Sequence, residues 1–234
     1  MRDAEAELKA IDVFAEGGDG AQKLISAMAL CGEPGSRGSW GRDVPDDESA
    51  VKQATPPSVS RCSAENHAKL YMKSVSWLAD GKGADKKAAE ENAYLALALD
   101  PKAELPADAK AGAKAAVAAM KKRGGPEVRL GAVSSSDEAT QKDLAVAAAG
   151  EVASAVRFCY AHGLLTNPNL QGSLTISAVV TKDGWLSLAG ASASVPDNGV
   201  VSCVTTFANR SKVNAPSKTP TKVSIPFTLT PGGK

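Results

Sequence analysis

The clearest periodicity lies in the last third of the chain, where a helical pattern is followed by two alternating segments. Apolar side chains recur on one face of a helix expected over about 137–162, at Ala145, Ala149, Val152, Val156 and Cys159. Beyond it, the alternating segments flank a Lys-Asp-Gly turn at 182–184, which is typical of a tight hairpin. The helix therefore has a half-buried hairpin to cover.

The chain continues with a second helix near Asn198 and ends with a third alternating segment. Pro226 lies within that last segment and cannot donate to a strand ladder, so the strand is expected at a sheet edge or beside a bulge. An edge strand can pair with an extended segment of a partner protein. The predicted partner-binding residues are Val223, Ile225, Phe227, Thr228 and Leu229.

The order of these elements predicts an α+β domain over 141–234, with a three-stranded antiparallel sheet and two helices. Residues 1–127 predict an α-helical domain, and a Ser-rich linker is expected over 128–140. The stretch 93–101 resembles the second helix of a tetratricopeptide repeat, although at most one repeat and a fragment are present. Helices are expected at about 8–15, 21–30, 64–79, 85–99 and 107–123, with a long polar loop at 33–60.

Composition limits the classes of partner. A formal net charge of +1 over 234 residues, without a basic stripe, gives no electrostatic reason to expect nucleic acid. Aromatic residues make up only 4% of the chain, so a core of small side chains gains from covalent cross-links. The four cysteines allow three pairings, of which the simplest joins Cys31 to Cys62 and Cys159 to Cys203. Such disulfides persist in oxidising compartments.

No residue pattern calls for catalysis, a cofactor or a metal. Cys159 and His162 share a helix face and could form a thiol–imidazole pair, but a disulfide would consume the thiol. No cysteine pair has the spacing of a redox or zinc motif. Trp40, in the 33–60 loop, is either packed on the helices or a partner contact. A glycan-binding protein or hydrolase that uses this loop is the alternative to a non-enzymatic interaction protein.

Short motifs between about 152 and 229 resemble the C-terminal domain of the TonB energy-transducer superfamily, and more closely its AgmX/PglI-type branch. They are Cys159-Tyr160, Pro168-Asn169-Leu170-Gln171-Gly172, Lys182-Asp183-Gly184, Val200-Val201-Ser202-Cys203 and Val223-Ser224-Ile225-Pro226-Phe227. The chain departs from the family pattern at Ala161, which replaces an acidic residue, and after Cys203, where a basic aromatic run is reduced. The resemblance implies a protein of the periplasm or outer membrane that binds envelope proteins by strand addition or in a helical groove. It further implies gliding-motility or outer-membrane transport machinery.

The sequence also bears on whether the chain spans or is anchored to a membrane. No hydrophobic run approaches the roughly 20 residues of a membrane helix, so no membrane span is expected. The first residues lead directly into a charged helix without a signal-peptide core. A signal or lipid anchor is therefore expected upstream of Arg2 in the native protein.

Overall fold

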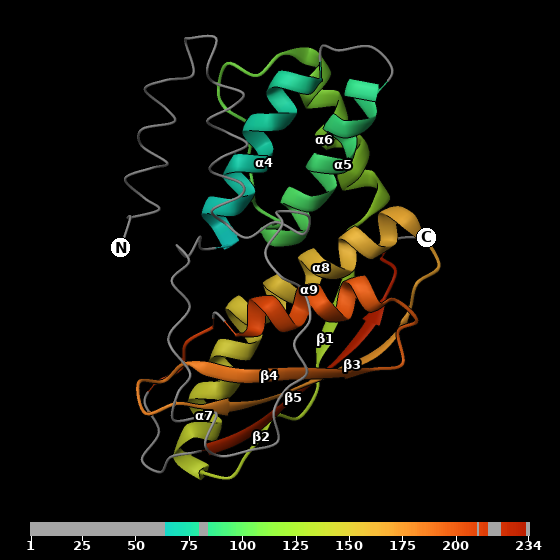
Figure 1. The fold of residues 1–234 in the computed structure, drawn as a ribbon. Coiled ribbons are helices and arrows are strands. Elements are labelled where there is room, and N and C mark those ends of the chain that lie inside the picture. Colours follow the sequence, from blue (N-terminus) through green and yellow to red (C-terminus); the bar gives the residue numbers. More distant parts are fainter. Residues whose placement is uncertain (1–63, 80–83, 210, 215–220, 233–234) are drawn as a thin grey trace. The chain divides into compact units, whose positions relative to one another are not determined.

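The computed structural model describes residues 64–79, 84–209, 211–214 and 221–232 (Figure 1). The expectations for the helices at 8–15 and 21–30, for Cys31, Trp40 and Cys62, and for the 33–60 loop lie outside these residues. The chain passes from one compact unit to a second between Gly125 and Pro126. Each unit is considered by itself.

The first unit contains three described helices, α4 (Ala64–Leu78), α5 (Ala84–Leu99) and α6 (Ala111–Arg123), each in contact with the other two. The first two confirm the predicted helices. Helix α6 begins later than position 107, because the Ala109 N–H donates to the Pro106 carbonyl (3.0 Å) in a turn that precedes it. Small apolar side chains fill the core between these helices, among them Ala68, Val75, Ala89, Ala93 and Ala113.

Polar contacts also join the helices of this bundle. The Asn92 side chain of α5 donates to the Ser74 hydroxyl of α4 (2.6 Å), and Ser74 donates in turn to the Tyr71 carbonyl (3.0 Å). The Arg123 guanidinium of α6 lies 4.5 Å from the ring centroid of Tyr94 on α5. Burial raises the pKa of the Tyr94 phenol, which therefore stays neutral beside this cation. Both contacts fix neighbouring helices to each other.

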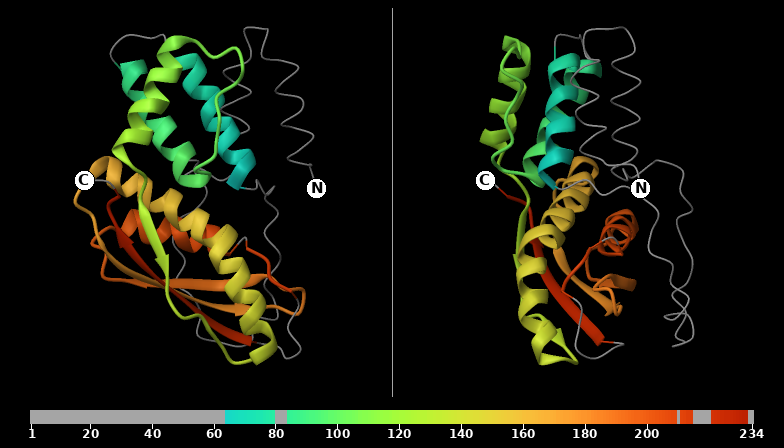
Figure 2. Two further views of the ribbon diagram at one scale, coloured as in Figure 1. Left: turned by 180° about the vertical axis from the view of Figure 1, so that it is seen from behind. Right: turned by 90° about the vertical axis from the view of Figure 1, so that its left-hand side faces the viewer.

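The second unit is a helix-covered antiparallel sheet, so the prediction of a mixed α+β chain is confirmed. In chain order the elements are β1 (Glu127–Leu130), β2 (Ser134–Ser135), α7 (Glu138–Ala147), the π-helical turn η1 (Ala148–Val152), α8 (Ala153–Thr166), β3 (Gly172–Val180), β4 (Leu186–Ala193), α9 (Asn198–Ala208) and β5 (Thr221–Thr230). The long helix from α7 through α8 lies with α9 along one side of the sheet (Figure 2). The described sheet has five strands, in the order β1-β5-β3-β4 with β2 beside β5 on the side of β1, so the expectation of three strands is wrong.

The helix predicted over 137–162 is present, but its buried face differs from the predicted one. Leu144, Ala148, Val152 and Val156 are buried, whereas Ala149 is exposed and Ala145 is only half-buried. Repeated spacings of four residues exceed the 3.6 residues of an α-helical turn. The wider π-helical turn at η1 keeps these side chains on the sheet side.

The hairpin expected around 182–184 is confirmed. Gly184 has φ 82°, the left-handed conformation that the turn requires and that glycine adopts without strain. Strand β3 buries alternate side chains, Leu174, Ile176, Ala178 and Val180, as its sequence predicts. Strand β4 carries a bulge, seen as a register shift opposite Ser177 and Val179 of β3.

Strand β5 is interior, so the expectation that it forms a sheet edge is wrong. It pairs with β3 along one side and with β1 and β2 along the other. The Pro226 carbonyl accepts from the Gly131 N–H (2.8 Å), and both main-chain groups of an antiparallel residue point to the same side. Pro226, which has no N–H to donate, therefore faces the break at residues 131–133 between β1 and β2. Four of the predicted partner-binding residues, Val223, Ile225, Phe227 and Leu229, are buried in the core.

The segment expected to be a linker over 128–140 belongs instead to the folded second unit. It supplies β1 and β2, and the chain then enters α7 at Glu138. Serine hydroxyls make this connection: Ser136 Oγ accepts from the Lys222 N–H (3.1 Å) and Ser135 Oγ accepts from the Asp137 N–H (3.1 Å). The serines that suggested a flexible linker thus fasten the segment to β5 and to the start of α7.

The stretch Glu138–Thr166 is 29 residues long and apolar enough to cross a membrane by length and composition alone. The expectation that no run of this kind exists is therefore too strict. In the structure 56% of its most apolar stretch is buried, where it forms the layer that covers the sheet, whereas Val146 is exposed.

Two glycines of the long helix provide a matched test of this packing. A methyl group at Gly163 would lie 2.6 Å from Val200 Cγ2 and 2.7 Å from Leu170 Cδ2, whereas nothing lies within 4 Å of one at Gly150. We expect Gly163→Ala to lower the free energy of unfolding by about 1–3 kcal/mol through overpacking. Gly150→Ala should raise it by about 0.5–1 kcal/mol through helix propensity. Urea denaturation measures both, and equal effects would contradict the close contact between α8 and α9.

Candidate functional site

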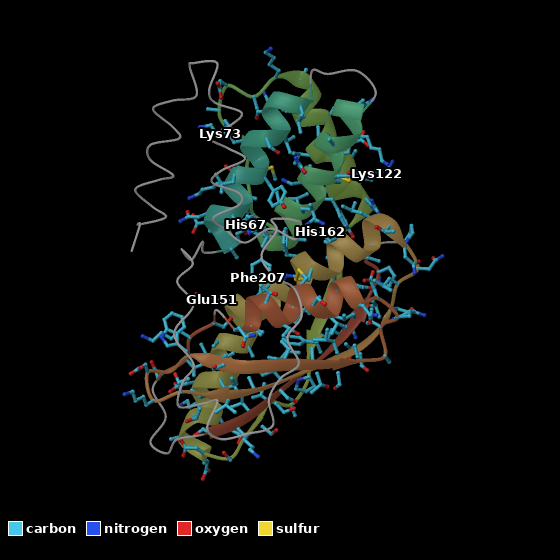
Figure 3. All side chains as sticks on the ribbon, in the orientation of Figure 1. His67, Lys73, Lys122, Glu151, His162 and Phe207 are labelled. Carbon is cyan, nitrogen blue, oxygen red and sulfur yellow. A yellow bond between two sulfur atoms is a disulfide. The ribbon has the colours of Figure 1, made fainter. Side chains whose placement is uncertain are left out.

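A buried disulfide joins the two helical segments that cover the sheet. Cys159 of α8 and Cys203 of α9 are bonded, with their Cα atoms 5.7 Å apart and their exposed fractions at 0% and 3%. This is the pairing that the sequence predicted. The Phe158 ring meets the Phe207 ring edge-on beside it, with centroids 5.7 Å apart. Figure 3 shows Phe207 among these side chains, and the contacts together fix α9 to α8.

The thiol–imidazole pair considered for Cys159 and His162 does not form. Cys159 is consumed by the disulfide, and the His162 ring packs edge-on against Phe158, with centroids 4.7 Å apart (Figure 3). Within the described residues, His162 Nε2 has no hydrogen-bond partner. Burial lowers the pKa of His162 to about 4, so the ring is neutral near pH 7. His162 is a packing residue of the α8 surface.

The motif positions around α8 are brought together by the turn that follows it. The Tyr160 hydroxyl donates to the Leu170 carbonyl, and the Leu170 N–H donates to the Asn167 carbonyl (3.1 Å). Tyr160 and Leu170 are both buried. The Cys-Tyr and Pro-Asn-Leu-Gln-Gly segments therefore have a structural role: they direct the chain from α8 into β3.

Within the part of the chain that the structure describes, the outer edge of β4 offers unpaired backbone groups. Among the described residues, only 211–213 pair with this edge, and only at its beginning. The Leu186 N–H donates to the Ser211 carbonyl (3.0 Å), and the Val213 N–H donates to the Gly184 carbonyl (2.8 Å). Trp185 and Lys212 form an antiparallel bridge, with the Lys212 ammonium 5.3 Å from the indole centroid. We call residues 211–213 the edge segment.

Beyond the bulge, the direction of each backbone group on β4 follows from one hydrogen bond. The Ser194 N–H donates to the Ser173 carbonyl (2.9 Å), so Ser194 faces β3. Successive residues of an antiparallel strand point their main-chain groups to opposite sides. Ser192 and Gly190 therefore also face β3, whereas Ala191 and Ala193 direct their N–H and C=O groups away from the sheet.

The two edges of the sheet differ in chemistry. The β1 and β2 edge is interrupted at 131–133 and carries Glu127 and Arg129, which form an ion pair (3.3 Å). Short strands and charged side chains are the usual protection of an edge against pairing with other chains. Strand β4, with the sequence LSLAGASA, has neither a charged residue nor a proline, and only its bulge interrupts it. It is the less protected edge.

The sequence could have indicated part of this site. The uncharged, alanine- and serine-rich run of β4 was visible, but its position at the edge depends on β5 entering the sheet between β1 and β3. Of the predicted partner-binding residues, only Thr228 is exposed, on the face opposite the helices. No group of three or more His, Cys, Asp or Glu side chains that could hold a metal lies within the part of the chain that the structure describes.

The fold of the second unit defines a disulfide-stapled α+β domain. Comparison of the chain with protein-family models, with curated proteins and with solved structures gives no match.

Removal of the disulfide tests how strongly it holds α9. The bond joins residues 44 apart in sequence, and on the chain-entropy model a loop of this length contributes about 4 kcal/mol. We expect the Cys159→Ala, Cys203→Ala double variant to lose about 2–5 kcal/mol of unfolding free energy in urea. Ser202→Ala, an exposed change on the same helix, serves as the control. A loss no larger than that of the control would contradict the stabilising role.

The lowered pKa of His162 gives a pH dependence of known sign. Between its unfolded pKa of 6.5 and its folded value of about 4, only the unfolded chain binds the proton. The contribution of His162 to the free energy of unfolding is therefore fully present above pH 6.5. It falls by up to about 3 kcal/mol as the pH drops toward 4. We expect His162→Leu to lose less stability than the wild type between pH 7 and 4.5. Equal losses in the two proteins, measured by urea denaturation, would contradict the buried neutral ring.

Proposed function

We propose that the second unit is a non-enzymatic protein-interaction module of the cell envelope, which captures an extended segment of a partner along the outer edge of β4. The observation that carries this proposal is the uncharged, proline-free run of β4, with the outward main-chain groups of Ala191 and Ala193. An edge of this kind pairs with an incoming strand, whereas the charged, interrupted edge opposite does not invite one. The interaction site moves from β5, where the sequence placed it, to β4.

The buried disulfide supports an extracytoplasmic location. Disulfides form and persist in oxidising compartments such as the bacterial periplasm, and they are rare in the cytosol. Cys159 and Cys203 lie in the core of the unit that carries the edge. The α+β fold with this bond fits the resemblance of its motifs to the TonB C-terminal domain. By analogy with that family, we propose a role in gliding-motility or outer-membrane transport machinery.

Backbone pairing at this edge is too weak to be the whole interaction. Ala191 and Ala193 offer four outward groups, and at a net 0.5–1.5 kcal/mol per hydrogen bond they contribute about 2–6 kcal/mol. Micromolar binding requires about 8 kcal/mol. Side chains of the partner segment must therefore also contact the module.

The alternative of a glycan-binding protein or hydrolase depends on the 33–60 loop. That loop lies outside the described residues, so no structural observation favours this function over strand capture.

Proline at a single outward position tests the proposal. Ala191→Pro removes an N–H that points away from β3, so the sheet keeps its ladder while the incoming strand loses a donor. We expect the full-length variant to lose the envelope protein that the wild type captures from envelope extract under non-reducing conditions. Mass spectrometry identifies the captured protein.

The matched control is Ala191→Ser, which keeps the N–H and should retain capture. Thermal unfolding of all three proteins shows whether the proline variant remains folded. Capture by a folded Ala191→Pro variant at the wild-type level would place the interaction elsewhere.

A further inference from the structure

We infer that the partner segment is uncharged and carries a β-branched or similarly small apolar residue, which docks on the flank of α9 formed by Val201 and Thr205. The inference rests on the proposed function, because it concerns a strand bound at the edge of β4. It goes further by stating which side chains that strand needs and which residues of α9 select them.

The position of α9 provides this flank. The helix packs on β4 and on α8, and its contacts with α8 include those of Val200, Cys203 and Phe207. Val201 and Thr205 are four residues apart and therefore lie on one face, which points away from the α8 side. Both side chains are half-buried, so each keeps surface for a further contact. A strand added beyond β4 comes to lie beneath them.

The edge segment shows how an extended chain fits here. Ser211 and Val213 are buried, with exposed fractions of 6% each, while Lys212 between them is exposed. The edge segment, which pairs at the beginning of β4, thus turns alternate side chains inward, and one of these is valine. A partner strand along 190–193 would repeat this alternation, with its inward side chains toward the α9 flank.

The absence of charged residues on β4 and α9 also favours an uncharged partner segment. Neither β4 nor α9 contains a charged residue, so an inward charge on the partner would be desolvated without an opposite charge from these two elements. Val201 offers only apolar surface, and the Thr205 hydroxyl is already donated to the Val201 carbonyl (2.9 Å). The flank therefore favours a small apolar side chain over a polar one.

The probe is a phage-displayed library of random heptapeptides, selected on the full-length oxidised protein. We expect the selected peptides to have Val, Ile or Ala at alternate positions and few charged residues. Synthetic copies of them are then titrated against variants by fluorescence anisotropy. Val201→Asp should weaken binding by about tenfold or more, because it places a charge against the inward side chain. The adjacent Ser202→Asp, on the exposed side of α9, should change it less than about twofold.

Val201→Thr, which keeps the shape but adds a hydroxyl, provides a milder second variant if Val201→Asp unfolds. It should weaken binding by a smaller but measurable factor, and Ala191→Pro should abolish binding. Peptides lost with Ala191→Pro but insensitive to both Val201 variants would overturn this inference and leave the strand-capture function standing. Failure to select any peptide, or binding that survives Ala191→Pro, would overturn both.

Discussion

The position of β5 is the constraint on which the second unit depends. This strand comes last in the chain, yet it lies inside the sheet and pairs with β3 on one side and with β1 and β2 on the other. Alternate side chains from Val223 to Leu229 enter the core beneath the helices. Because β5 fills the interior, β4 forms one edge of the sheet, opposite the edge formed by β1 and β2. The candidate interaction site is thus a consequence of where the C-terminal strand inserts.

Local structure could be predicted from the sequence, whereas strand order could not. Periodicity located the described helices and the hairpin, and the Asp-Gly pair fixed the turn at Gly184. Pro226 suggested an edge strand, but proline removes a donor on one side only, and the gap between β1 and β2 accommodates that loss. The short strands β1 and β2 are too brief to show alternation, so their serines suggested a linker. The pairing partners of a strand are long-range information that no local pattern contains.

The helices position the site as much as the sheet does. The disulfide between Cys159 and Cys203 and the close approach at Gly163 fix α9 against α8. With α9 fixed on β4, its flank formed by Val201 and Thr205 keeps a constant position for the partner strand that we propose. Rigid placement lowers the conformational entropy that binding would otherwise cost. The buried disulfide therefore also fixes the position of the α9 surface beside the edge of β4.

Amide hydrogen exchange, measured by NMR on the oxidised 234-residue chain, shows whether the edge of β4 is available in the free protein. We expect the Ala191 and Ala193 amides to exchange rapidly, while the Ser192 amide, which points toward β3, is protected. If Ala191 and Ala193 were protected as strongly as Ser192, another part of the chain would already occupy the edge, and β4 could not capture a partner strand.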